Sequence, residues 1–131
     1  MIYMFDTDTI SFFMKDKPKN IRINTAKYEK DDFCISAITS AELMFGLKRN
    51  YSKQLDFWIH EIINKFKVIS FDDASAEIYG EIRTDLEKSG VPLDNMDMLI
   101  AASALKTGAI LISHNKKHFS KIKGLKTEDW C

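Results

Sequence analysis

The chain has 131 residues, a length typical of one domain, so we predict that residues 1–131 fold as a single unit. The 45% share of hydrophobic residues excludes wholesale disorder, and the balance of 19 basic and 19 acidic residues excludes a mainly electrostatic, non-specific nucleic-acid coat. No apolar stretch reaches the length of a membrane helix, and the two cysteines, Cys34 and Cys131, fit neither a disulfide framework nor a zinc pattern, which together predict a reduced, cytoplasmic protein without a membrane partner.

The expected elements alternate between strand and helix in chain order. In the first half, with residues 18–32 unassigned, the patterns predict strand 2–5, helix 9–15, strand 33–36, helix 38–50 and helix 52–66. In the second half they predict strand 68–70, helix 72–88, helix 96–106, strand 109–113 and a short strand near the end of 119–130. This alternation is typical of an α/β domain whose central, mostly parallel sheet is covered by helices on both faces.

Three acidic residues stand beside hydrophobic elements rather than in solvated charge runs. Asp6 ends the first strand, Glu42 lies early in the helix after the second strand, and Asp97 lies early in a strongly apolar helix. In open parallel sheets, ligands bind outside the carboxyl ends of the strands, a rule that selects Asp6, residues 36–38 and residues 113–115. Carboxylates that meet there raise one another's pKa values or recruit a cation, and their hard oxygens suit Mg²⁺ or Mn²⁺ rather than zinc.

Each of these acids also has a simpler structural explanation. Asp6 can be a turn or cap residue, Glu42 can be the partner of Thr39 in a capping box, and Asp97 can be a first-turn acid favoured by the helix dipole. The helix N-termini expected near Glu42 and Asp97 would stabilise negative charge in either case. A functional site is favoured because all three acids are expected at the same end of the sheet.

Several segments together resemble a known family. They are MFDTD at 4–8, ITSAELMFG at 38–46, YGEIR at 79–83, LEKSG at 86–90, DNMDMLIAA at 94–102, LISHN at 111–115 with Phe119, and GLKTEDW at 124–130. The combination is similar to the motifs of PIN-domain ribonucleases, and in particular to their VapC branch, the toxins of VapBC toxin–antitoxin modules. Residues 15–32 and 50–66 are not covered by the resemblance.

The resemblance implies a three-layer α/β/α PIN-like fold and Mg²⁺-dependent endonuclease cleavage of RNA, such as tRNA or another structured RNA, with Mn²⁺ as the alternative ion. It also implies a homodimer and a higher complex with an inhibitory VapB-like antitoxin. Carried over by residue, Asp6 and Asp97 would be metal ligands, and Glu42 would complete a catalytic acidic triad. Attack by an ion-activated water predicts 5′-phosphate and 3′-hydroxyl ends, whereas attack by the ribose 2′-hydroxyl would leave a 2′,3′-cyclic phosphate.

Two positions depart from the family pattern. Asp8 stands where asparagine is usual, and it either adds charge near the site or caps the following helix. Of these two roles, we expect the helix cap. His114 and Asn115 stand where many PIN domains carry a fourth acid, and Asn115 could orient a water through its amide but supplies no charge. Asp94, one helical turn before Asp97, either compensates for the missing acid or caps its helix.

Accessory and RNA-binding roles are expected for a further set of residues. Thr7 and Ser113 either orient waters and ligands or act as turn hydroxyls that satisfy the backbone. The basic run Lys116, Lys117 and His118 either contacts RNA phosphates or forms a solvated loop.

Large apolar side chains on the helices expected at 38–50 and 52–66 predict a groove for an amphipathic antitoxin helix, with core packing as the alternative for any one of them. They are Phe45, Leu47, Tyr51, Phe57 and Trp58.

Two other functions compete with the ribonuclease. The main alternative is a catalytically inactive PIN-like domain that binds RNA or protein, and the three retained acids argue against it. A phosphoaspartate receiver domain is less favoured, because neither residues 33–36 nor residues 68–70 end in a suitable acceptor acid.

Overall fold

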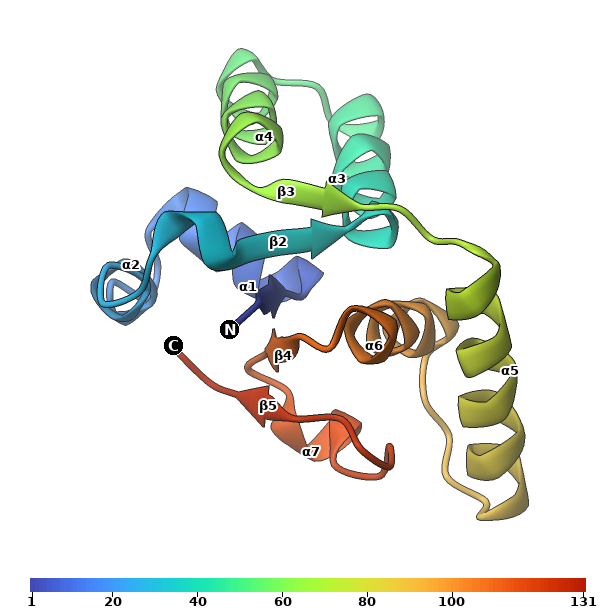
Figure 1. The fold of residues 1–131 in the computed structure, drawn as a ribbon. Coiled ribbons are helices and arrows are strands. Elements are labelled where there is room, and N and C mark those ends of the chain that lie inside the picture. Colours follow the sequence, from blue (N-terminus) through green and yellow to red (C-terminus); the bar gives the residue numbers. More distant parts are fainter.

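The computed structural model describes residues 1–131 and has five strands in one sheet. The strands are β1 (Tyr3–Phe5), β2 (Phe33–Ser36), β3 (Lys67–Ile69), β4 (Ile110–Ile112) and β5 (Thr127–Glu128). Their order is β3-β2-β1-β4-β5, as Figure 1 shows, and every neighbouring pair is parallel. The carboxyl ends of all five strands therefore lie along one edge, and the predicted parallel sheet is confirmed.

Helices connect the strands and cover the sheet. They are α1 (Thr7–Lys15), α2 (Asn20–Thr25), α3 (Ala37–Arg49), α4 (Lys53–Lys65), α5 (Asp73–Lys88), α6 (Asn95–Thr107) and α7 (Lys116–Phe119). A single 3₁₀ turn, η1 (Lys30–Asp32), leads into β2. None of the helices combines the length and apolar character needed to cross a bilayer.

Two hydrophobic cores, one on each face of the sheet, make the architecture three-layered. Tyr3 and Phe5 of β1 join the core formed with α1, α2, α3 and α4, whereas Met4 joins the core formed with α5, α6 and α7. All three residues are buried, which is why β1 is a continuous apolar run instead of alternating with polar residues. The expected α/β/α class is confirmed.

Phe5 lies at the centre of the first core and has no exposed surface. Its ring packs against Phe66 with 5.1 Å between centroids and against Trp130 with 5.6 Å, both near perpendicular. Because Phe5 directly precedes Asp6, this aromatic packing fixes the end of β1 and hence the backbone that carries the first candidate acid.

Helix α1 begins earlier than the sequence predicts. Asp6 is its N-cap, and the Asp6 Oδ1 accepts a hydrogen bond of 2.9 Å from the Thr9 amide. The expectation that Asp8 caps this helix is therefore wrong. Asp8 is already the second helical residue, because the chain turns into the helix directly after β1.

Helix α3 also begins earlier, which corrects the expected position of Glu42. Ser36, the last residue of β2, caps this helix, and its Oγ accepts a hydrogen bond of 3.1 Å from the Ile38 amide. Thr39 and Glu42 therefore do not form the expected capping box. Glu42 is the sixth helical residue, beyond the first turn to which helix-dipole stabilisation is confined.

Two short helices were not predicted. Helix α2 lies in the unassigned stretch 18–32 and buries Ile21 and Thr25. Helix α7 covers the basic residues 116–118, for which a solvated loop was the alternative, and buries Phe119. Helices this short are marginal by propensity alone, so they depend on tertiary packing that a local pattern does not reveal.

Candidate active site

Asp6 lies at the carboxyl end of the central strand β1, and only 4% of its surface is exposed. Burial raises the pKa of its carboxyl group, hydrogen bonds from Ser113 and Thr9 work against the rise, and the nearby charge of Asp8 adds to it. A buried carboxylate in this setting is costly to ionise without a cation. The structure thus places Asp6 at the edge selected from the sequence.

Thr7 joins the end of β1 to helix α3. Its hydroxyl donates a hydrogen bond of 2.5 Å to Glu42 Oε1 and lies 3.2 Å from the Thr39 hydroxyl. Glu42 is half-buried and Thr39 is fully buried, so this contact orients the carboxylate of Glu42 toward the same edge as Asp6. The part played by Thr39 was missed, although it lies one turn before Glu42 in the same sequence motif.

Asp97 lies in the first turn of α6, as predicted, and is half-buried. Its pKa is raised to about 6, first by burial and then by the negative charges of Asp94 and Asp6, with a smaller contribution from Glu42, while the charge of His118 lowers it. The charges of Asp6 and Glu42 both act on Asp97, so carboxylates 91 and 55 positions apart in the chain lie near one another.

Asp94 belongs to this acidic edge and is not a hydrogen-bonding cap. It occupies the N-cap position of α6, yet its side chain accepts no capping hydrogen bond. Among the neighbouring charges, that of Asp94 acts most strongly on Asp97. With Asp8, whose charge acts on Asp6, the acidic edge therefore carries five carboxylates, from residues 6, 8, 42, 94 and 97.

Ser113 and Asn115 follow β4 next to the acids. Ser113 is fully buried, and its Oγ accepts a hydrogen bond of 2.9 Å from the Asn115 backbone amide. The side-chain amide of Asn115 donates to Asp8 Oδ2 at 3.3 Å. Asn115 therefore faces Asp8, and the two departures from the family pattern are hydrogen-bonded to each other.

The basic run Lys116, Lys117 and His118 forms α7 next to this edge. All three side chains are exposed, whereas Phe119 is 1% exposed and packs in the second core. The buried ring holds the short helix in place, and its charged face is open to solvent beside Asp97.

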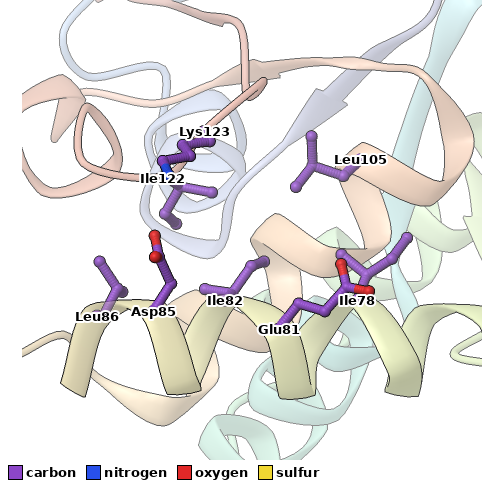
Figure 2. A pocket seen from close by; sticks show the side chains of 8 residues that line it. All are labelled: Ile78, Glu81, Ile82, Asp85, Leu86, Leu105, Ile122 and Lys123. Atoms are coloured by element: carbon purple, nitrogen blue, oxygen red, sulfur yellow. The ribbon is translucent and has the colours of Figure 1, made fainter. Parts of the chain in front are cut away.

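A cavity of about 250 Å³ lies elsewhere, between α5, α6 and the segment after α7 (Figure 2). Ile82 and Leu86 project from α5 toward Leu105 and Ile122, and none of the acids of the acidic edge lines the cavity. It therefore offers no part of the acidic site.

The chemistry of the donor set fits a hard divalent cation. Two unit charges about 4 Å apart at an effective dielectric of 20 repel by about 4 kcal/mol, so clustered carboxylates gain by sharing a cation. Carboxylate oxygens suit Mg²⁺ or Mn²⁺, whereas zinc sites generally include imidazole or thiolate ligands.

Comparisons with known proteins agree with this geometry. A family model described as PIN domain matches residues 3–125. The chain is 33% identical to the tRNA(fMet)-specific endonuclease VapC of Salmonella typhimurium, and the match covers 98% of each chain. The chain belongs to the VapC branch of the PIN-domain family. Ribonucleases with PIN domains generally depend on divalent metal ions.

Other VapC proteins extend the agreement to sequence and structure. Ribonuclease VapC1 of Haemophilus influenzae is 35% identical over 99% of this chain and 98% of its own length. The DNA-bound VapBC complex of Salmonella typhimurium contains a chain that matches with a TM-score of 0.92 at 31% identity, covering 100% of this chain and 99% of that one. The VapBC2 complex of Rickettsia felis, bound to a promoter DNA fragment, gives 0.92 at 32% identity and covers 100% of both chains.

Replacing Thr7 with Val should lower RNA cleavage by about 10- to 100-fold, because loss of a group that orients a ligand of the active site has effects of this size. The hydroxyl that holds Glu42 is removed, while the shape of the side chain is kept. Single-turnover cleavage rates measure the effect. Thr84→Val, at an exposed position of α5, is the matched control, and equal rates in the two variants would contradict a positioning role for Thr7.

Proposed function

We propose that this chain is the toxin of a type II toxin–antitoxin module and an endoribonuclease that uses Mg²⁺ held at the acidic edge. The main support is that Asp6 is buried at the end of the central strand and that its charge acts on half-buried Asp97, in a chain of the VapC branch. Several relatives are named ribonuclease or endonuclease VapC. The retained acids disfavour an inactive, merely binding domain.

Asp6 and Asp97 are the proposed ligands of the ion, and Glu42 completes the acidic triad. When bound, Mg²⁺ polarises the scissile phosphate and makes a water a better nucleophile, with Mn²⁺ as the alternative ion. The Thr9 amide fixes the carboxyl group of Asp6 by a hydrogen bond, and Thr7 does the same for Glu42. Asp94 adds negative charge beside Asp97, in partial compensation for the missing fourth acid.

Residues around the triad have supporting roles in this proposal. Ser113 hydrogen-bonds Asp6, and Asn115 restrains Asp8 at the same edge. The exposed side chains of α7, from Lys116, Lys117 and His118, are placed to attract the phosphates of RNA as it approaches the acids.

The substrate class and the partner follow from the relatives. Because two of them are named tRNA(fMet)-specific endonucleases, we propose tRNA or another structured RNA as substrate, which would place the activity in the cytoplasm. Because structures of VapC relatives contain VapBC complexes, we propose a VapB-like antitoxin as partner, together with a homodimer and a higher toxin–antitoxin complex.

Three of the five side chains expected to line an antitoxin groove are exposed, and the other two are not. Phe45, Tyr51 and Phe57 are 66%, 60% and 62% exposed and remain candidates for antitoxin contact. Leu47 is 6% exposed and Trp58 is half-buried against the first core, so these two belong to the core, which was the alternative for each.

Incubation of purified chain with tRNA, in Mg²⁺ and in chelator, tests the proposal. We expect Mg²⁺-dependent fragments with 5′-phosphate and 3′-hydroxyl ends, which Asp6→Asn should abolish. Asp73→Asn removes an exposed acid from the start of α5 and should cleave normally. Cleavage that persists in Asp6→Asn, or fragments ending in a 2′,3′-cyclic phosphate, would refute this mechanism.

A further inference from the structure

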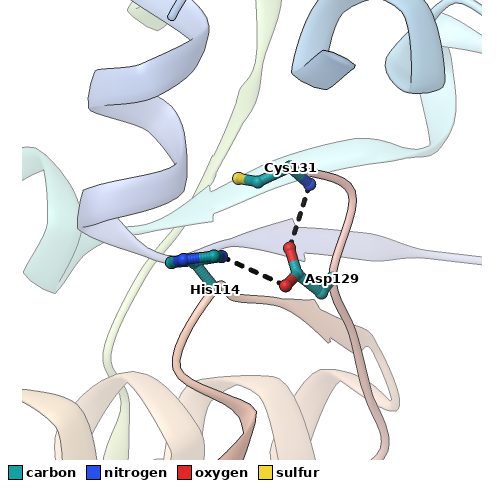
Figure 3. A group of neighbouring side chains, drawn as sticks. All are labelled: His114, Asp129 and Cys131. Carbon is teal, nitrogen blue, oxygen red and sulfur yellow. Dashed lines mark hydrogen bonds and ion pairs between the residues drawn. The ribbon is translucent and has the colours of Figure 1, made fainter. Parts of the chain in front are cut away.

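A second cluster of metal-ligating side chains lies outside the acidic triad (Figure 3). It consists of His114, Asp129 and Cys131, whose ligand atoms all lie within 4.8 Å of one another. His114 is the second residue after the end of β4, and Asp129 is the first residue after β5. The Ser113 amide donates to the Glu128 carbonyl oxygen at 2.9 Å, so the parallel pairing of the two strands brings these side chains together.

Contacts within the cluster hold its members in place. His114 Nδ1 lies 3.1 Å from Asp129 Oδ2, and the Cys131 backbone amide donates to Asp129 Oδ1 at 2.9 Å. The ring of Phe12 packs edge-to-face against the imidazole, with 6.1 Å between centroids. Figure 3 shows the sulfur of Cys131 on the side of the imidazole, while Asp129 approaches from the β5 end.

We propose that His114, Asp129 and Cys131 bind one Zn²⁺ ion, with water as the fourth ligand. Imidazole, thiolate and carboxylate are the ligands that zinc takes, and a thiolate is a poor ligand for Mg²⁺. With bond lengths of about 2.0–2.3 Å, the ligand atoms of a tetrahedral site lie about 3.3–3.6 Å apart. The imidazole and carboxylate are already close to that spacing, and the thiol, which lies within 4.8 Å of both, would have to move closer to reach it.

Zn²⁺ binding would replace hydrogen bonds within this cluster by metal–ligand bonds. The Cys131 thiol loses its proton to solvent as the sulfur–zinc bond forms, and neither oxidant nor reductant is needed. The ion would tie the segment after β5 to the turn after β4. That turn carries Asn115, whose side-chain amide donates a hydrogen bond to Asp8 at the acidic edge.

The spacing of these residues gives no sequence signal. Neither the interval from His114 to Asp129 nor that from Asp129 to Cys131 matches a zinc motif, and the two cysteines taken as a pair fit none. Cys34 is 2% exposed in the second core and cannot contribute. Cys131 is therefore the one accessible thiol of the chain.

Titration of the reduced, metal-free full chain with Co²⁺ tests this proposal, because a cobalt–thiolate bond gives a charge-transfer band in the near ultraviolet. We expect the band to saturate at one equivalent and to disappear when Zn²⁺ is added. It should be lost in Cys131→Ser, and the affinity should fall at least about tenfold in His114→Asn. Cys34→Ala should retain it.

The same titration separates this site from the acidic triad. Asp6→Asn should keep the cobalt–thiolate band, because Asp6 is not a ligand of the second site. A chain that fails to cleave RNA could therefore still bind zinc at this cluster, and a chain that binds no zinc there could still cleave RNA. Absence of the band in the unmodified chain, or its survival in Cys131→Ser, would show that His114, Asp129 and Cys131 form a hydrogen-bonded cluster only.

Discussion

Replacing Asp97 with Asn should reduce RNA cleavage by at least about 10²-fold and, at the same time, make the metal-free protein more stable at neutral pH. Activity falls because a proposed ligand of the divalent ion is lost. Stability rises because burial and the charges of Asp94 and Asp6 raise the pKa of Asp97 to about 6, so at neutral pH its ionised form destabilises the folded state relative to the unfolded chain. Cleavage rates and thermal unfolding in chelator measure the two effects.

The stability gain expected for Asp97→Asn depends on pH in a definite direction. A carboxyl group with a raised pKa in the folded state destabilises the fold as pH rises through about 4 to 6, where the unfolded chain is ionised first. The stability gain of Asp97→Asn should therefore be present at neutral pH and shrink as the pH falls through 6. Asp73→Asn, at an exposed acid, should change neither property. An active or less stable Asp97→Asn protein would refute the assignment.

Replacing Phe5 with Ala should cost about 3–5 kcal/mol of unfolding free energy, the range for removing a buried aromatic ring. Phe5 is fully buried, and its ring contacts Phe13, Phe66 and Trp130 in edge-to-face geometry. Domains of this kind have about 5–15 kcal/mol of stability in total, so the loss is a large part of it. Urea unfolding followed by circular dichroism measures the change.

An exposed aromatic residue provides the matched control for this truncation. Phe45 on α3 is 66% exposed, and Phe45→Ala should change the unfolding free energy by no more than about 0.5 kcal/mol. If Phe5→Ala cost no more than Phe45→Ala, the aromatic core would not be what fixes β1 and Asp6.

Elements with strong local patterns were predictable from the sequence. The apolar runs of β1, β2 and β4 and the periodic spacing of α4 to α6 identified the parallel α/β sheet, because both of its faces are buried and its strands are correspondingly hydrophobic. Helices α2 and α7 were missed because each is held by one or two buried side chains, such as Ile21 and Phe119, whose partners are distant in the chain.

The grouping of the candidate acids at one edge of the sheet was predictable, but their local hydrogen bonding was not. The strand-end rule selected Asp6 as a candidate, and the family motifs selected Glu42 and Asp97. Asp6 was not expected to be the helix cap in place of Asp8, because either residue could start a helix by sequence alone. The pairing of Thr7 with Glu42 depends on how α1 and α3 meet in space.

The second cluster was not predictable at all. Its members come together because β5 pairs with β4, and β5 is only two residues long. A strand this short carries too little pattern to fix the register of Asp129 against His114. Only the three-dimensional pairing reveals their proximity.

Electron paramagnetic resonance of Mn²⁺, which reports the free ion, tests most directly whether residues 6, 42 and 97 hold one divalent cation. At neutral pH the unmodified chain should bind one ion that Mg²⁺ displaces, and Asp6→Asn, Glu42→Gln and Asp97→Asn should each lose most of this binding. Because burial and neighbouring acids raise the pKa of Asp97 to about 6, the affinity for the ion should fall about tenfold for each pH unit below that value. Binding that survives in all three variants would contradict the account.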